Sequence, residues 1–230
     1  GAKAIGLAPV DSAGVAPAVT DAMQSGIPII AIDTGVSGAD VTSFVATDNY
    51  AVAKVQGAVA ATLVNDGDTI IYVTGNQAQS TGQERRNGFM EAFSAARPNS
   101  KILEVPTEWN SQQAQEGVEA VLNANSEVKM VANAWDGGTM GAKAALENLG
   151  YGAGDVKLVG FDGASDAIAA MDEGWVHADT AQMLYQMGYQ GIKAAAAAAR
   201  GEEVSSRIDT GFFLVTPSTA GVYKKMVGIE

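Results

Sequence analysis

The 230-residue sequence contains no cysteine and a single histidine, His177. Without cysteine there is no disulfide bond, no thiol nucleophile and no cysteine-ligated zinc. The absence of cysteine also does not distinguish an oxidising from a reducing cellular compartment. One histidine cannot build the paired-histidine metal sites of hydrolases. We expect His177, in a predicted strand beside Trp175, to have a structural or surface role. We also expect no resident metal and no cofactor.

Positive charge is also scarce, with 14 Lys and Arg against 26 Asp and Glu and a net charge of -12. A nucleic-acid binder needs a cationic surface to displace phosphate counterions, so we expect no nucleic-acid partner. No uncharged run is apolar and long enough to cross a bilayer, which takes about 20 residues. The chain is 47% hydrophobic and 17% charged, which is enough apolar content for a substantial core.

Catalytic signatures are missing from the sequence as well. It contains no GxxxxGK[ST] phosphate loop, no GxGxxG after a strand and no GxSxG nucleophile elbow. Residues 126–129 match SxxK in letters, but they lie in a predicted loop that enters a strand rather than at a helix start. We therefore expect a protein that is not an enzyme.

Short apolar runs alternate with helical patterns along most of the chain. Strands are predicted at residues 4–8, 28–32, 69–74, 101–105, 129–133, 156–161 and 176–181, and a short apolar segment lies at residues 44–46. Further helices are predicted at about residues 81–96, 112–123, 137–149, 165–172 and 184–200. This alternation predicts an α/β fold with parallel sheets covered by helices on both faces.

The first two helices are predicted from their apolar spacing. Asp11 or Ser12 is a candidate cap for a helix whose inner face carries Val15, Val19 and Met23. Thr47 or Asp48 is a candidate cap for the second helix, and a spacing of three and four residues places its apolar side chains on one face: Val52, Val55, Val59 and Leu63.

Polar and aromatic side chains gather where the predicted strands end. Ligands of parallel α/β sheets bind beyond the carboxyl ends of the strands. The residues at those ends are Asp33, Thr47, Asp48, Asn76, Trp109, Trp135, Asp136, Asp162 and Gln182, and Arg85 lies in the helix after Asn76. Sugars and polyols present hydroxyls that donate and accept, and C–H faces that pack on aromatic rings. This set of side chains therefore indicates a neutral polyhydroxylated ligand.

Five segments occur in the order and spacing of a known family: residues 29–33 (IIAID), 47–49 (TDN), 83–89 (QERRNGF), 159–163 (VGFDG) and 181–182 (AQ). They resemble the type I, ribose-binding-protein-like sugar-binding proteins of ABC transporters, over essentially the whole chain. The resemblance implies two Rossmann-like lobes joined by a three-crossover hinge, with the sugar in the cleft between them. The implied lobes are residues 1–47 plus 183–209, and 48–182 plus 210–230.

The same resemblance implies the roles of individual residues. Asp33, Arg85, Asp162 and Gln182 match polar ligand contacts, Asn76 falls at another contact position, and Trp109 stands where a Phe packs on the sugar. Ribose binders instead place Asn, Arg and Asn at the positions of Ala8, Thr34 and Trp135, so we do not expect ribose itself. We expect Trp109 and Trp135 to contact opposite or adjacent faces of one ring-sized ligand.

Structural alternatives stand beside these roles. Asp33 is a candidate cap of the following loop. Arg85 is a candidate ion-pair partner of Glu84 or Glu91, and in that case Arg86 would contact the ligand. The indoles of Trp109 and Trp135 are candidates for core packing. Asp136 and Asp162 are candidate helix caps, and Gln182 a candidate hinge residue.

The resemblance also implies that two strand–helix units precede residue 1 in the family, roughly 60 residues at about 30 residues each. Without them we expect an incomplete first lobe with an unpaired strand edge and exposed apolar faces. We expect a fragment, or a chain completed by a partner chain or by strand exchange.

The expected function is the solute-binding component of an ABC transporter, which delivers a neutral sugar or polyol to a membrane permease. The alternative is the effector-binding core of a LacI-like transcription regulator. We expect a periplasmic protein or an extracellular lipoprotein whose signal peptide is not part of these residues. The sequence names neither the sugar and its anomer, nor the permease, nor the oligomeric state.

Overall fold

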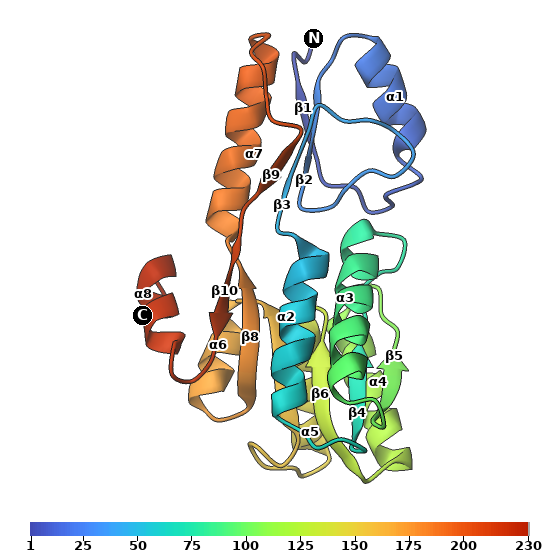
Figure 1. The fold of residues 1–230 in the computed structure, drawn as a ribbon, viewed down its shortest axis with the longest axis vertical. Helices are drawn as coiled ribbons and strands as arrows, with labels where there is room; N and C mark the ends of the chain where they lie inside the picture. The colour runs from blue at the N-terminus through green and yellow to red at the C-terminus, as the bar shows by residue number, and fades with distance from the viewer. Residues whose placement is uncertain (230) are drawn as a thin grey trace. The chain divides into compact units, whose positions relative to one another are not determined.

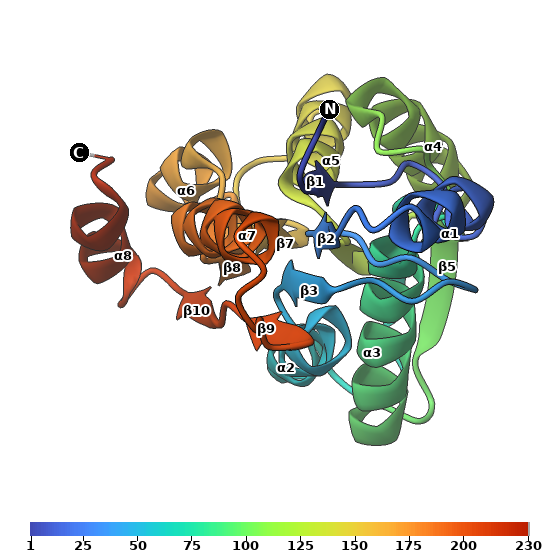
Figure 2. The same cartoon turned by 90° about the horizontal axis from the view of Figure 1, so that it is seen from above.

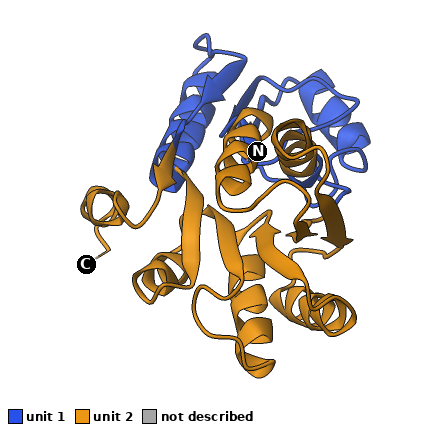
Figure 3. Ribbon diagram, turned by 60° about the horizontal axis from the view of Figure 1, so that its bottom comes forward, with its two compact units in different colours: residues 1–49, 77–83, 183–212 blue, residues 50–76, 84–182, 213–230 orange. Residues whose placement is uncertain are grey.

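The computed structural model describes residues 1–229, and the chain divides into two compact units (Figures 1 and 3). Unit 1 comprises Gly1–Asn49, Gln77–Gln83 and Met183–Phe212. Unit 2 comprises Tyr50–Asn76, Glu84–Gln182 and the residues from Phe213 onward. Within residues 1–229, no helix combines the length and apolar character that a membrane span requires.

Unit 1 is built on a four-stranded sheet with the order β1-β2-β3-β9, and its three strand pairs are parallel. The strands are β1 (Ile5–Leu7), β2 (Ile29–Ile32), β3 (Ser43–Ala46) and β9 (Arg207–Asp209). Two helices belong to this unit, α1 (Ala16–Gln24) and α7 (Leu184–Ala199). Helix α7 packs along the sheet (Figure 1), where Gly191 leaves room for Ile32: a Cβ at Gly191 would lie 2.6 Å from the Ile32 side chain.

The core of unit 1 is small and part of its apolar surface is exposed. Four residues form its buried cluster: Ile30, Val45, Ala194 and Ala198. Strand β1 lies at the sheet edge with Ile5 36% exposed, and Tyr185 on α7 is 80% exposed. The unpaired edge and exposed apolar face expected from the sequence are therefore present in this unit.

Unit 2 contains a six-stranded sheet with the order β10-β8-β7-β6-β4-β5. Its strands are β4 (Thr69–Val73), β5 (Lys101–Val105), β6 (Val128–Asn133), β7 (Lys157–Asp162), β8 (Val176–Gln182) and β10 (Phe212–Val215). The pairs β4–β5, β4–β6, β6–β7 and β7–β8 are parallel, so their carboxyl ends lie at one edge of the sheet.

Helices cover both faces of the six-stranded sheet, as the alternation predicts. They are α2 (Asn49–Thr62), α3 (Ser80–Ala96), α4 (Ser111–Ala124), α5 (Asp136–Asn148), α6 (Ser165–Asp172) and α8 (Ala220–Val227). Figure 2 shows α4 and α5 on one side of the sheet and α2 and α3 on the other. Most of the protein's buried apolar residues belong to this unit, including the stacked pair Tyr72 and Phe89, with ring centroids 4.4 Å apart.

The buried face of α2 includes most of the predicted apolar residues but is wider than they are. Val52 is buried and Val59 and Leu63 pack against the core, and the centre of the face is formed by Ala53, Gln56, Gly57 and Ala60. A Cβ at Gly57 would lie 2.7 Å from the Phe89 carbonyl oxygen on α3. Close approach of two helix backbones requires small residues, and apolar spacing alone does not reveal this.

Two further differences concern the ends of the chain. Helix α1 begins at Ala16, and neither Asp11 nor Ser12 caps it: Asp11 Oδ1 accepts from the backbone N–H groups of Ala13 and Gly14, while Ser12 Oγ accepts from Ser80. After residue 200, where no strand or helix is predicted, the structure adds β9, β10 and α8.

Candidate functional site

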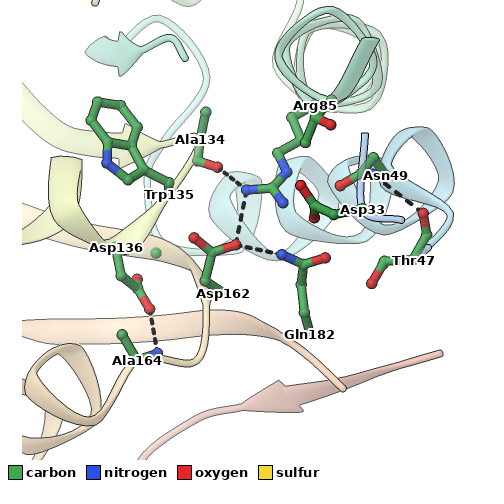
Figure 4. A network of polar contacts seen from close by, with 12 residues as sticks. Asp33, Thr47, Asn49, Arg85, Ala134, Trp135, Asp136, Asp162, Ala164 and Gln182 are labelled. Atoms are coloured by element: carbon green, nitrogen blue, oxygen red, sulfur yellow. Dashed lines mark hydrogen bonds and ion pairs between the residues drawn. The ribbon is translucent and has the colours of Figure 1, made fainter. Parts of the chain in front are cut away.

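Three predicted site residues form one network at the carboxyl end of the sheet in unit 2 (Figure 4). Arg85 Nη1 donates to Asp162 Oδ1 over 2.9 Å and to the Ala134 carbonyl oxygen over 2.7 Å. Gln182 Nε2 donates to the same Asp162 oxygen over 2.7 Å. The Arg85 side chain is 3% exposed and that of Asp162 is 25% exposed. The network therefore fixes the carboxylate in place while part of it stays accessible.

The structure separates the two neighbouring arginines. Arg86 lies on the surface of α3, where its Nε donates to Glu104 Oε2 over 2.6 Å. Glu91 pairs with Lys54 and accepts a hydrogen bond from Tyr50. The guanidinium in the network is thus that of Arg85, and neither Arg86 nor Glu91 takes part in it.

Trp109 and Trp135 lie against each other beside this network. Their ring centroids are 5.3 Å apart and their planes meet at 86°, an edge-to-face contact. Trp135 is 8% exposed and Trp109 is half-buried, with the Arg85 guanidinium carbon 5.7 Å from its ring centroid. Because the indoles touch, no ligand ring fits between them. Trp135 belongs to the buried core of unit 2 and Trp109 packs against it, and contact of either indole with a ligand stays a prediction.

Gly75 makes the position of Trp109 possible. A Cβ at Gly75 would lie 1.9 Å from Cη2 and 2.0 Å from Cζ3 of the Trp109 indole, far inside van der Waals contact. The indole therefore lies directly on the backbone just beyond β4. Asn76 follows in the same segment of unit 2.

The remaining predicted residue, Asp33, belongs to unit 1. It directly follows β2, and its Oδ2 accepts a hydrogen bond from Thr34 Oγ1 over 3.1 Å. Nearby in unit 1, the Asn49 side-chain amide donates to the Thr47 carbonyl oxygen (Figure 4).

Backbone strain marks three of the predicted residues. Over the described residues 1–229, the non-glycine residues with positive φ are Asp33 at 67°, Trp109 at 57° and Asp162 at 119°. Such conformations cost on the order of 1–3 kcal/mol and gather at functional sites. All three lie at strand ends that the sequence marks for ligand contact.

The start of α6 is held by Asp136 rather than by Asp162. The backbone N–H of Ala164, the residue before α6, donates to Asp136 Oδ2 over 2.7 Å, and Tyr223 Oη donates to the Gly163 carbonyl oxygen over 2.9 Å. Asp136 stands in the first turn of α5, whose N-cap is Trp135. Its carboxyl group is thus a bridge between two helix starts.

Several supporting groups are not among the predicted site residues. Gln56 Nε2 donates to the carbonyl oxygens of Asn133 and Gly160, and the Phe161 ring centroid lies 4.0 Å from the Arg85 guanidinium carbon. Asp179 lies fully buried in β8. The only sequence signal for Asp179 is a carboxylate inside an otherwise buried strand, VHADTAQ.

The chemistry of the site is that of binding. In the part of the chain that the structure describes, no cluster of three His, Cys, Asp or Glu residues is arranged to hold a metal ion. The network offers a fixed carboxylate, a guanidinium and an amide, and two indoles lie beside it. These groups recognise hydroxyls and C–H faces.

Comparisons with known proteins agree with this chemistry. A family model described as the periplasmic binding protein domain matches residues 1–203. A ribose import binding protein from Salmonella typhimurium is 31% identical over 215 residues, which cover 94% of this chain and 72% of that protein.

Two solved structures are also similar to this chain. An ABC transporter solute-binding protein from Mycobacterium smegmatis, with bound glycerol, is 33% identical with a TM-score of 0.87, over 96% of this chain and 76% of that one. One from Bacillus halodurans, with bound myo-inositol, is 27% identical with a TM-score of 0.91, over 97% and 77% of the two chains.

These matches confirm the predicted fold class and favour the transport protein over the LacI-like regulator. The fold is the type I periplasmic-binding-protein fold, and relatives of this kind are periplasmic proteins that bind sugars and work with a membrane permease. The chain belongs to the periplasmic binding protein family, as a non-enzymatic binding component of an ABC importer.

Proposed function

We propose that the chain binds a neutral sugar or sugar-like polyol and delivers it to a membrane permease. The observation that carries this proposal is the network of Arg85, Asp162 and Gln182 beside the Trp109 indole. A carboxylate accepts from neighbouring hydroxyls, a guanidinium and an amide donate to them, and an indole packs on their C–H face. Asn76, Trp135 and Asp33 are the further proposed ligand contacts.

The charge around the site favours a neutral ligand. Burial raises the pKa of Asp136 and Asp179, the charge of nearby Asp162 raises both further, and Arg85 is already paired with Asp162. An added phosphate or uronate would meet carboxylates with one guanidinium to offset them. Anionic sugars are therefore expected to be rejected.

The ligand is proposed to differ from ribose. Ala8, Thr34 and Trp135 replace two amides and a guanidinium with small or aromatic side chains. Fewer hydrogen-bonding groups and a larger indole suit a ligand with more apolar surface than a fully hydroxylated pentose, such as a deoxysugar or a cyclic polyol.

The proposed lobes are residues 1–47 plus 183–209, and residues 48–182 plus 210–230, with crossovers near Asp48, Met183 and Thr210. Hinge closure around ligand belongs to the fold, and a few residues at the crossovers absorb the change in backbone dihedral angles.

We also propose that a further polypeptide segment completes unit 1, supplied by a partner chain or by strand exchange. The edge position of β1 and the exposed Tyr185, Tyr189 and Ile192 on α7 support this proposal. Light scattering after size exclusion measures the mass. A monomer that binds its sugar with ordinary affinity would contradict the proposal, and an assembly would support it.

A thermal-shift screen tests the proposed ligand class. Pentoses, hexoses, deoxysugars, cyclic polyols and sugar phosphates are compared at one concentration, because a ligand that binds only the folded state raises Tm. We expect at least one neutral compound to raise Tm, with no effect from the phosphates. A shift from a phosphate alone would contradict the proposal. Asp162→Asn should lose the shift, and the exposed Asp166→Asn should keep it.

A further inference from the structure

Two carboxyl groups are buried together beneath the turn that carries Asp162. Asp136, at the start of α5, is 2% exposed, and Asp179, in β8, is fully buried. Gly160 on β7 gives both of them room, because a Cβ there would lie 2.4 Å from Asp179 Oδ2 and 2.5 Å from Asp136 Oδ1. The two oxygens thus occupy the space that any larger residue would fill.

The pair lacks donors for most of its oxygens. Asp136 Oδ2 accepts from Ala164, but Asp136 Oδ1 and both oxygens of Asp179 have no hydrogen-bond partner among the described residues when both acids are ionised. The Gly163 N–H lies close enough to Asp179 to lower its pKa, without a hydrogen bond of ordinary geometry. One proton held between the carboxyl groups turns one of them into a donor for the other.

The surrounding charges oppose a doubly ionised pair. Asp162 on β7 faces both carboxyl groups, and Arg85 on α3 lowers the pKa of Asp179 but is already bonded to Asp162. Burial raises the pKa of Asp179 to about 7, and burial followed by the charge of Asp179 raises the pKa of Asp136 well above its usual range. On α8, burial and then the charges of these three acids raise the pKa of Tyr223 to about 12.

We propose that Asp136 and Asp179 share one proton, and that this protonated pair positions the turn Asp162-Gly163-Ala164 for ligand. With the proton in place on Asp136, the carboxyl with the higher pKa, Asp136 donates to Asp179 through Oδ1, and its Oδ2 keeps the bond from the Ala164 N–H. Without it, two adjacent negative charges push against each other and against Asp162. The effect on ligand rests on the proposed function of Asp162, but the shared proton does not.

The proton makes both folding and binding depend on pH in a definite direction. The pKa of the pair is higher in the folded than in the unfolded chain, so its stabilising contribution is complete at acidic pH and is lost as pH rises. From the usual aspartate pKa of about 4 up to pH 7, the value near which the pKa of Asp179 lies, the unfolding equilibrium constant should rise by up to about tenfold per pH unit for one shared proton, and it should level off once the folded chain has lost that proton. Ligand affinity should instead fall as pH rises through and beyond about 7, because binding depends only on the protonation of the folded chain.

Asp179→Asn tests the pair, because the amide keeps the shape and donates to Asp136 at every pH. We expect its urea-unfolding profile to be flat from about pH 5 to 7, the range in which wild type loses stability as its unfolded chain releases the proton and its folded chain keeps it. The exposed Asp21→Asn should follow wild type. Parallel wild-type and Asp179→Asn profiles would overturn the proposal.

A second measurement needs no variant to fold. Infrared spectroscopy of wild type should detect a buried protonated carboxyl group at pH 6 that disappears towards pH 9, and its absence at pH 6 would overturn the proposal. Sugar titrations over the same pH range then isolate the positioning role. A flat affinity profile beside a sloping stability profile would overturn positioning alone, whereas failure of every sugar to bind would contradict the proposed function and leave the proton test intact.

Discussion

Asp162 combines a strained backbone with a fixed side chain. Its φ of 119° lies in a region that favours glycine, and its carboxylate accepts from Arg85 and Gln182. A loop aspartate facing solvent needs neither feature. The strain and the network are consistent with selection for one carboxylate position, which is what recognition of a vicinal diol requires.

Replacing Asp162 should weaken both binding and folding. A hydrogen bond to a charged group contributes about 1.5–3 kcal/mol, so Asp162→Ala should raise Kd roughly ten- to several-hundred-fold. Stability should fall as well, because the Arg85 side chain is 3% exposed and loses its carboxylate partner, which should cost about 2 kcal/mol or more.

Asp162→Gly is the matched variant, because glycine adopts a φ of 119° without strain. It should lose as much affinity as the alanine variant in calorimetric titration but less stability in urea melts. Normal sugar binding by either variant would contradict a ligand role for Asp162.

Gly75 should control the aromatic surface. In Gly75→Ala the new Cβ would meet the Trp109 indole at 1.9 Å and displace it. We expect binding about fivefold to tenfold weaker, since an aromatic contact is worth about 1 kcal/mol, together with altered tryptophan fluorescence. Gly221→Ala is the control, because nothing lies within 4 Å of its Cβ position. Unchanged affinity in Gly75→Ala would remove Trp109 from the ligand surface.

Among the elements, β6 and β7 stop pairing before they reach the site. Ala132 and Val159 are the last residues that pair between the two strands. Beyond them, Gln56 from α2 donates to the carbonyl oxygens of Asn133 and Gly160 over 2.8 and 2.9 Å. A helix side chain thus replaces the ladder where the strands end. The same divergence, with no side chain on Gly160, leaves room for Asp136 and Asp179.

Gln56→Leu should test this bridge. It removes the donor of two buried carbonyl groups, and leaving such groups unsatisfied costs about 1–3 kcal/mol each, so we expect a loss of roughly 2–6 kcal/mol in urea melts. The exposed Gln112→Leu on α4 should change stability far less. Equal effects of the two substitutions would show that the bridge contributes nothing.

The sequence predicts elements better than it predicts contacts between them. Strands and most helices follow from alternation, since burial of both sheet faces leaves continuous apolar runs such as residues 156–161. The buried face of α2 is predicted only in part, because Gly57 and the alanines at its centre carry no strong apolar signal. The choice of Arg85 over Arg86 and the Asp136–Asp179 pair depend on side chains more than 40 positions apart, and no local pattern contains that information.

At the scale of the whole molecule, the chain carries a net charge of -12, and its site offers a guanidinium already bound to a carboxylate. Both features act against anionic ligands. The net charge repels them at long range, and salt screens this repulsion, whereas the carboxylates of the site repel them locally. We expect a sugar phosphate to bind at least about tenfold more weakly than its parent sugar. This difference should persist at about 0.5 M salt, which screens the long-range repulsion by the net charge. Recovery of phosphate binding in high salt would assign the rejection to net charge instead of to the site.

Calorimetric titration of the best neutral compound from the thermal-shift screen tests the central claim most directly, with wild type and Asp162→Ala measured at pH 6. The account predicts saturable binding to wild type, roughly ten- to several-hundred-fold weaker binding to the variant, and no heat of binding from the matching sugar phosphate. Equal affinities of wild type and Asp162→Ala, or tighter binding of the phosphate, would contradict it.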